Sequence, residues 1–284
     1  MVTARTFIDC SRDGDLGYFA GVPYEKGNAT GAVQYPTLMF RLHQVNDEIA
    51  LFRGKPNFDK LLKQANESGQ WFLPRTSAIF SPQVHSGEWR VNLTQVMKKD
   101  SSAPDGTNIF DLTFAELESW RQIANAFCFM KQNVPGFENS YLLEIAPQIG
   151  IRESRRLAGL YTLTEEDILL ARKFDDSIGV NGWPIENHTK DSIQWKWIGG
   201  CGYHQIPFRS LIPVNVKNLF MAGRCASFTS EALASVRVSG PCFVMGEAVG
   251  TAAALNLKNN RVVDETDVHE LQEKLVQNGV FLGN

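Results

Sequence analysis

The stretch 218–255 combines the residue types that a site for a negatively charged group requires. Its first part, 219–222, is a short apolar run that predicts a buried strand, and Gly223 and Arg224 end that strand. After a loop, Gly240 and Pro241 predict the start of a helix, because proline is favoured in the first helical position. Free N–H groups and the helix dipole both attract anions at such a start. The stretch therefore predicts a strand, a turn and a helix that bind an anionic group.

The same helix carries small residues at Gly246, Ala248 and Gly250. Residues of this size allow a neighbouring backbone or a flat ligand to approach closely. We therefore expect this face to pack tightly against the sheet. Leucine at Gly246 or Gly250 would then overpack the contact, at a cost of about 1–3 kcal/mol.

Two further groups are candidates for contact with a substrate. The run from Arg152 to Arg156 follows the apolar segment 149–151, where a guanidinium would offer permanent, bidentate positive charge to an acidic ligand. A solvated helix start explains the same run equally well. His204 stands just ahead of Ile206, and either catalysis or a structural hydrogen bond explains it, the structural role being the commoner for a lone histidine.

Other classes of chemistry have no support in the sequence. No group of histidine, cysteine and acidic residues has the spacing of metal ligands, so no metal is expected. Ser227 and Ser230 lie outside any Gly-x-Ser-x-Gly elbow, which argues against a hydrolase triad. A net charge of −3 with both signs interspersed argues against nucleic acid, and no apolar run approaches the length of a membrane span. The five cysteines lack Cys-x-x-Cys spacing, which favours a reducing, cytoplasmic location.

Periodicity indicates how the rest of the chain is organised. Strands are expected at 6–9, 37–42, 77–80 and 88–94, the last of them alternating apolar and polar residues. A capping box from Thr113 to Glu116 predicts a helix, along which apolar residues recur at 117, 120, 124 and 127. A second helix should open at Thr164 and close at 172–173, and a last one should cover 267–277.

Four segments of the chain carry motifs in a recognisable order. They are 8–16 with Asp-Gly-Asp-Leu, 150–164 with Arg-Glu-Ser-Arg-Arg, 203–213, and 218–255 with Leu-Phe-Met-Ala-Gly-Arg. Together these segments resemble the FAD-dependent oxidoreductases, flavoproteins with a glutathione-reductase-like dinucleotide fold. Because the four matches span nearly the whole chain in order, the resemblance is far more specific than any single match.

The resemblance implies an α/β fold. Its core would be a partial, Rossmann-like, three-layer FAD-binding domain formed by residues 1–34 and 145–284, ending in helices. Residues 35–144 would form an inserted β-rich cap with one helix, which would contact the substrate. The implied activity is flavin-dependent oxidoreduction, in which FAD accepts a hydride from a small-molecule substrate.

The resemblance also implies roles for particular residues. One set of residues would bind FAD, and a second set would act in catalysis or bind an anionic substrate. The cofactor set is Asp13, Gly14, Gly223, Arg224, Arg237, Ser239, Gly240 and Pro241, and the catalytic set is Arg152, His204 and Arg209.

One element of the family pattern is missing from the sequence. The family opens with a Gly-x-Gly-x-x-Gly turn that holds the pyrophosphate, and no such turn occurs here. In addition, Arg12 stands where the family has the glycine of Ala-Thr-Gly. These departures favour an alternative: a non-catalytic remnant, or one subunit of a split flavoprotein that needs a separate N-terminal polypeptide to hold FAD.

Overall fold

The computed structural model describes residues 2–190 and 193–283, which divide into two compact units. The first unit contains the residues up to Val33, Glu153–Asn187 and those from Gln194 onward. The second contains Gln34–Arg152 and His188–Ile193. Each unit has its own hydrophobic core, so each is described separately.

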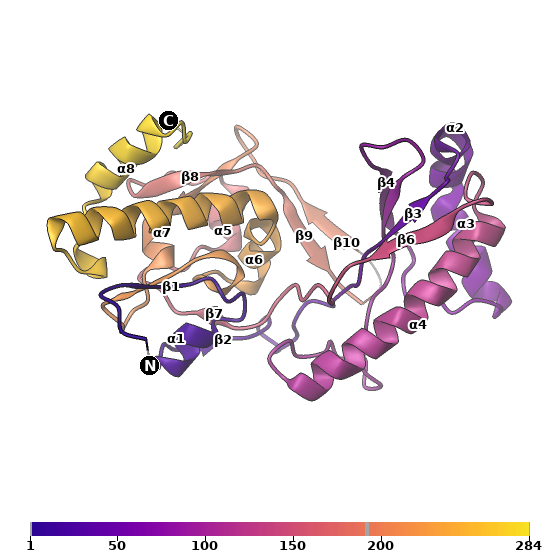
Figure 1. The fold of residues 1–284 in the computed structure, drawn as a ribbon, viewed down its shortest axis with the longest axis horizontal. Helices are drawn as coiled ribbons and strands as arrows, with labels where there is room; N and C mark the ends of the chain where they lie inside the picture. The colour runs from indigo at the N-terminus through magenta and orange to yellow at the C-terminus, as the bar shows by residue number, and fades with distance from the viewer. Residues whose placement is uncertain (1, 191–192, 284) are drawn as a thin grey trace. The chain divides into compact units, whose positions relative to one another are not determined.

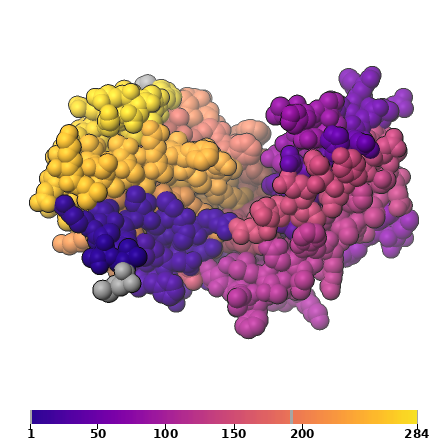
Figure 2. Space-filling model, viewed as in Figure 1, coloured from indigo at the N-terminus to yellow at the C-terminus, as the bar shows by residue number. Residues whose placement is uncertain are grey.

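The first unit joins the two ends of the chain through a parallel pair of strands. Strand β1 (Phe7–Asp9) lies beside β12 (Leu219–Met221), with Phe7 opposite Leu219 and Asp9 opposite Met221. Figure 2 shows the N-terminal segment in indigo against the orange C-terminal third. Parallel pairing places the carboxyl ends of both strands at the same edge, which is where ligands bind in open α/β sheets.

The other strands of the first unit form short two-stranded sheets (Figure 1). The pairs are β2 (Tyr24–Glu25) with β7 (Arg156–Leu157), β8 (Ser177–Asn181) with β11 (His204–Pro207), and β9 (Ile185–His188) with β10 (Ile193–Lys196). The helices are α1 (Asp15–Phe19), α5 (Glu165–Leu169), α6 (Ser230–Val236), α7 (Ser239–Asn259) and α8 (Val268–Gln277), with 3-10 turns η2 (Phe208–Leu211), η3 (Gly223–Cys225) and η4 (Val263–Glu265). The mixture of helix and strand agrees with an α/β fold, and the three-layer arrangement stays a prediction.

The second unit is an antiparallel sheet packed against helices. The strand order is β4 (Ile79–Pro82), β5 (Trp89–Asn92), β3 (Phe40–His43) and β6 (Tyr141–Ile145). The helices are α2 (Asp47–Ile49), the π-helical turn η1 (Ala50–Gly54), α3 (Lys55–Ser68) and α4 (Ile109–Asn133). Trp89, Phe58 and Phe129 are fully buried between the sheet and the helices. The expected strands are present, but the unit contains more than the one helix that the sequence pattern predicted.

Some local signals are confirmed and others are displaced. Helix α5 opens at Thr164 as expected, with a capping box between Thr164 and Asp167, and α8 begins where expected, after Asp267, which caps it. Helix α5, however, ends at Leu169, ahead of the basic residues expected to close it. Helix α4 begins at Ile109, because the Asn108 side chain accepts hydrogen bonds from the N–H groups of Phe110 and Asp111. A capped start four residues upstream makes Thr113 an internal residue of the helix.

Helix α7 also differs from the expectation in two respects. It begins at Ser239, so Pro241 is the third helical residue, where its missing N–H still costs no helical hydrogen bond. The expected tight packing at Gly246 and Gly250 is wrong, since a Cβ added at either glycine would meet no atom within 4 Å. The buried face of the helix is formed instead by residues such as Met245 and Ala252.

The open surroundings of Gly250 lead to a testable expectation. Gly250→Ala should raise the free energy of unfolding by about 0.5–1 kcal/mol, because glycine inside a helix is less favourable than alanine. Gly17→Ala is the control with the opposite sign, since its Cβ would lie 2.4 Å from Leu157 Cδ1. Urea denaturation measures both changes. A destabilised Gly250→Ala variant would mean that this face is packed.

Within the described residues, no single helix is long and apolar enough to cross a membrane. Helices α6 and α7 meet the length and composition criteria only when taken together, and they are bent by 92° at their junction. Both helices contribute buried residues, among them Leu233 and Val249, to the core of the first unit.

Candidate functional site

The carboxyl ends of β1 and β12 are held together by buried polar contacts. The Ala222 N–H donates to the Asp9 carbonyl at 3.0 Å, which carries the pairing to the end of both strands. The buried carboxylate of Asp9 accepts from the N–H groups of Ser11 at 2.9 Å and Gly17 at 2.8 Å. These contacts fix the loop after β1, and this loop contains the predicted residues Asp13 and Gly14.

Asp13 and Arg224, both predicted cofactor residues, form an ion pair. An Arg224 Nη2–H donates to Asp13 Oδ1, and the Nε–H donates to the Arg12 carbonyl at 3.2 Å. Burial lowers the pKa of Arg224, and the Asp13 carboxylate works against that shift. The result is a buried cation held at the strand ends by the loop after β1.

The start of α7 lies beside this ion pair. A Cβ added at Gly223, which has φ +83°, would lie 3.9 Å from Cys242 Sγ in the first turn of α7. Val238 gives the helix no side-chain cap, and Ser239 and Gly240 are exposed. The first turn of α7 therefore has N–H groups without a side-chain cap, and such a helix start attracts anions.

The structure explains why glycine occupies position 14. Gly14 has φ +65°, and a Cβ there would lie 3.1 Å from Leu157 Cγ and 3.3 Å from Cys225 Cβ. Arg12 has φ +69°, a left-handed conformation that costs an L-residue roughly 1–2 kcal/mol. The arginine therefore occupies a backbone position suited to glycine, as the comparison with Ala-Thr-Gly suggested.

Arg237, another predicted cofactor residue, lies at the end of α6 and is directed into the protein. One of its Nη2–H groups donates to the Glu186 carbonyl at 2.9 Å. Burial lowers the pKa of Arg237 to about 10, against the opposing effect of Glu186 and Glu153. The guanidinium thus belongs to a buried charge network within the first unit.

Arg156 is the main residue of this unit that the sequence reasoning did not single out. Its side chain is 3% exposed and donates to the Phe228 carbonyl from Nε at 2.9 Å and to the Gly27 carbonyl from Nη2 at 2.8 Å. A third contact is an ion pair with Glu153, whose side chain is fully buried. Its place in the Arg-Glu-Ser-Arg-Arg motif was the available sequence signal. The motif contains several arginines, however, and only the folded structure shows which of them is buried.

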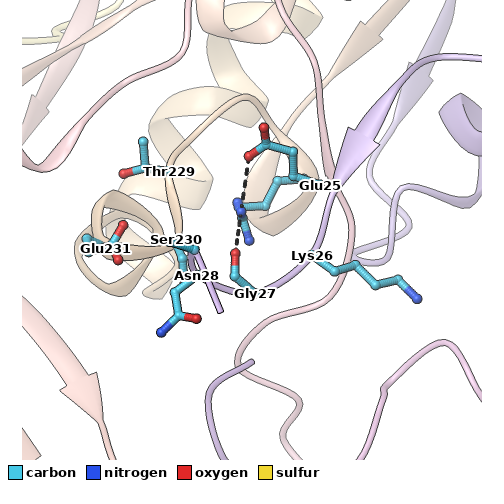
Figure 3. A pocket seen from close by; sticks show the side chains of 9 residues that line it. Glu25, Lys26, Gly27, Asn28, Thr229, Ser230 and Glu231 are labelled. Carbon is cyan, nitrogen blue, oxygen red and sulfur yellow. Dashed lines mark hydrogen bonds and ion pairs between the residues drawn. The ribbon is translucent and has the colours of Figure 1, made fainter. Parts of the chain in front are cut away.

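Arg156 also lines a cavity of about 440 Å³ (Figure 3). The wall combines residues 25–29 with Thr229, Ser230 and Glu231 at the start of α6. Glu25 Oε2 lies 3.5 Å from Arg156 Nη2, and Lys26 extends away from Glu231 in this view. The cavity is therefore polar and offers both carboxylates and a buried guanidinium to a small molecule.

The structure places His204 in a closed environment. Its Nδ1 lies 3.0 Å from the Gln205 carbonyl and so donates, which leaves Nε2 to accept from Asn181 Nδ2 at 3.0 Å. Burial lowers the pKa of His204 to about 4. A neutral ring with both nitrogens hydrogen-bonded matches the structural alternative for this residue, and we assign it no catalytic role.

The lowered pKa of His204 predicts a pH dependence of stability. Between pH 6.5 and about 4 the unfolded chain binds a proton that the folded chain does not, so stability falls as the pH is lowered through this range. The shift corresponds to about 3 kcal/mol. His204→Gln should remove this slope in urea denaturation series, whereas His269→Gln, at an exposed position, should retain it. Equal slopes in both variants would contradict the buried, neutral assignment.

The other two candidates for catalysis, Arg209 and Arg152, each have hydrogen-bond partners within their own unit. Arg209 binds Asp176 through Nε at 2.9 Å and Nη2 at 3.3 Å, and this pairing raises the pKa of Arg209. Arg152 belongs to the second unit, where an Nη1–H donates to the Tyr35 carbonyl.

Comparison with known proteins identifies the family of the chain. The model of the FAD dependent oxidoreductase family matches residues 1–275, which include both strands and the whole of α7. The chain belongs to the FAD dependent oxidoreductase family. No curated protein and no solved structure matches it significantly.

The cofactor of this family is FAD, and the described residues fit part of that group. The uncapped start of α7 and Arg224 offer positive potential, and nothing lies within 4 Å of a Cβ added at Gly240. A glycine-rich turn for the pyrophosphate has no counterpart in the sequence.

Proposed function

We propose that the chain forms the catalytic part of a flavin-dependent oxidoreductase, in which FAD receives a hydride from a small-molecule substrate. The observation that carries this proposal is the Gly223–Arg224 turn beside the open N-terminus of α7, in a member of a flavoprotein family. When bound, FAD supplies the hydride-accepting ring.

The protein's own contribution is electrostatic. Arg224 and the first-turn N–H groups of α7 present fixed positive charge where a negatively charged part of the cofactor would lie. Because these groups are positioned by the fold, they need no reorganisation when charge develops nearby. Gly223 keeps the turn free of a side chain, so that a flat group can approach.

The cavity lined by Arg156 is the proposed substrate position. Its charged wall, with Glu25 and Glu231 beside a buried guanidinium, suits a small polar molecule that carries both hydroxyl or amine donors and an acidic group. Arg152 and Arg209 were expected to bind an anionic substrate group. Asp176 binds Arg209, and the Tyr35 carbonyl accepts from Arg152, so both arginines stay predictions for this role.

The proposal is tested by optical spectroscopy of the purified protein with added FAD. Stoichiometric binding should give the yellow flavin bands, and an oxidisable substrate should bleach them under anaerobic conditions. Bleaching should be lost in Glu25→Gln/Glu231→Gln while the flavin bands remain. A protein that binds no FAD at any concentration would contradict the proposal.

One observation favours the second candidate, a subunit of a split flavoprotein. Phe7 and Asp9 use their backbone groups to pair with β12, so the alternate residue Ile8 directs its N–H and C=O to the opposite edge. Strand β1 has no second neighbouring strand within the described residues, and that edge is a template for strand addition. A separate polypeptide with a strand and a glycine-rich turn would complete the cofactor site. Tight, stoichiometric FAD binding by this chain alone would rule out the split arrangement.

A further inference from the structure

The cavity beside Arg156 has a wall whose charges are unequal in sign. Residues 25–29, Arg156 and residues 229–231 line it, and all of them belong to the first unit (Figure 3). Its volume of about 440 Å³ is within the range of sites for small molecules. The charges that a ligand meets in this cavity therefore indicate which chemical class it recognises.

The positive charge of Arg156 is already compensated within the wall. Its Nε–H donates to the Phe228 carbonyl at 2.9 Å, and an Nη2–H donates to the Gly27 carbonyl at 2.8 Å. An Nη1–H donates to the carboxylate of Glu153, and the side chains of this ion pair are almost completely buried. Since a guanidinium has five N–H groups and three are used in this way, little capacity remains for an anionic ligand.

Two carboxylates of the wall remain accessible. The side chain of Glu25 is 81% exposed, and its Oε2 lies 3.5 Å from Arg156 Nη2. Glu231 is partly exposed and forms no hydrogen bond or ion pair within the residues that the structure describes. Lys26 extends away from Glu231 in Figure 3, and two carboxylates outnumber its single ammonium group. The accessible charge of the cavity is therefore negative.

Ser230 supplies a hydroxyl to the same wall. The residue is 7% exposed, and its hydroxyl has no hydrogen-bond partner in the described part of the chain. Helix α6 does not need this hydroxyl as a cap, because Thr229 Oγ1 accepts from the Ala232 N–H at 3.2 Å. Buried polar groups are normally hydrogen-bonded, so a hydroxyl left without a protein partner in a cavity wall is available to a ligand.

Asn28 offers a donor to the cavity. Its Oδ1 accepts from the Thr30 N–H at 3.0 Å and from Thr30 Oγ1 at 2.7 Å, so the side-chain oxygen is occupied by its own turn. The Nδ2 group has no acceptor within the described residues, and it can donate to an oxygen atom of a ligand. The cavity therefore combines acceptors for a cation with one donor for a neutral oxygen.

We propose, on the basis of the function proposed above, that the substrate of this cavity is a small hydroxylated amine. Glu231 and Ser230 accept hydrogen bonds from its ammonium group, and Glu25 adds negative potential. Asn28 Nδ2 donates to its hydroxyl oxygen. An ammonium group has three N–H donors and no acceptor, which matches a wall of carboxylate and hydroxyl oxygens.

The first test is isothermal titration of the purified full chain, without FAD, with three probes of equal chain length. The probes are 4-amino-1-butanol, 1,4-butanediol and 4-hydroxybutyrate, which share one hydroxyl end and differ in the charge of the other. The amino alcohol should bind roughly tenfold more tightly than the diol, because a hydrogen bond to a charged group is worth more than a neutral one. The anionic probe should bind most weakly. Tightest binding of 4-hydroxybutyrate would assign recognition to Arg156 and overturn the proposal, as would equal binding, or no binding, of all three.

Substitutions show whether the amine occupies this cavity. Glu231→Gln keeps the shape of the side chain and removes its charge, so it should weaken binding of the amino alcohol roughly tenfold and leave the diol unchanged. Glu166→Gln, at an exposed glutamate of α5 in the same unit, is the matched control and should change neither. Ser230→Ala should weaken the amino alcohol as well, since it removes an acceptor. Equal affinities of the Glu231→Gln and Glu166→Gln variants for the amino alcohol would place the amine elsewhere and overturn the proposal.

Measuring binding without FAD separates this proposal from the flavin function. A chain that binds the amino alcohol through Glu231 but binds no FAD would support the amine site and contradict the flavin function. A FAD-loaded protein whose flavin bands are bleached by an anionic substrate, but by no amine, would support the flavin function and overturn the amine site.

Discussion

Arg156→Ala should lower the free energy of unfolding by about 3–5 kcal/mol, the cost of breaking a buried ion pair by removing one partner. The arginine side chain is 3% exposed and that of Glu153 is fully buried, so the substitution leaves a carboxylate in the interior without its cation. The Phe228 and Gly27 carbonyls lose their donors as well. Few single substitutions in the first unit should have a larger effect.

Arg156→Lys separates charge from geometry at this position. Lysine keeps the positive charge but cannot direct Nε and two terminal nitrogens at Glu153 and two carbonyls together. We expect Arg156→Lys to recover less than half of the lost stability in urea denaturation. Arg41→Ala is the control: it removes an ion pair with Glu144 whose side chains are 41% and 52% exposed, and such pairs contribute about 0–1 kcal/mol. Equal effects of Arg156→Ala and Arg41→Ala would show that the Arg156 pair is solvated.

Arg224→Ala should weaken FAD binding at least tenfold, the largest effect expected on the cofactor. The reason is that Arg224 is the buried cation at the ends of β1 and β12, beside the open start of α7. A charge-assisted contact in such a site contributes about 1.5–3 kcal/mol, which corresponds to a tenfold change or more. Titration of the protein with FAD, followed by flavin fluorescence, measures the change.

Two comparisons make the FAD result specific to the site. Arg261→Ala removes an arginine from a partly exposed pair with Glu270, and it should leave FAD affinity unchanged. The far-ultraviolet circular dichroism of Arg224→Ala should match the wild type, which would exclude unfolding as the cause. If Arg224→Ala bound FAD as tightly as Arg261→Ala does, the cofactor would lie elsewhere in the unit.

The local elements of the site were accessible from the sequence because their signals act over a few residues. Four apolar residues followed by Gly223 and Arg224 predicted a strand and a turn, and β12 and η3 are in place. Caps such as Thr164 and Asp267 act on N–H groups within one helical turn, so these helix starts were predictable. The family followed from the same motifs, and the family model confirms it.

Burial was harder to predict, because it depends on which elements meet. Leu117 and Trp120 have the helical spacing of a core face, yet the core of the second unit takes the face with Ile123 and Phe129. Gly246 and Gly250 suggested tight packing, and the fold presents them to open space. In each case the sequence contains two plausible faces, and only the arrangement of the neighbouring strands and helices selects one.

The sequence by itself therefore determined the family, the cofactor and the positions of the principal strands and helix caps. Tertiary structure alone decided that β1 pairs with β12, more than 200 residues later, and that Asp13 and Arg224 meet there. It also decided which arginine of the run 152–156 is buried against Glu153. The physical reason is that hydrophobic periodicity and capping are short-range, whereas ion pairs and cavities are formed by side chains that only the folded backbone brings within a few ångströms of each other.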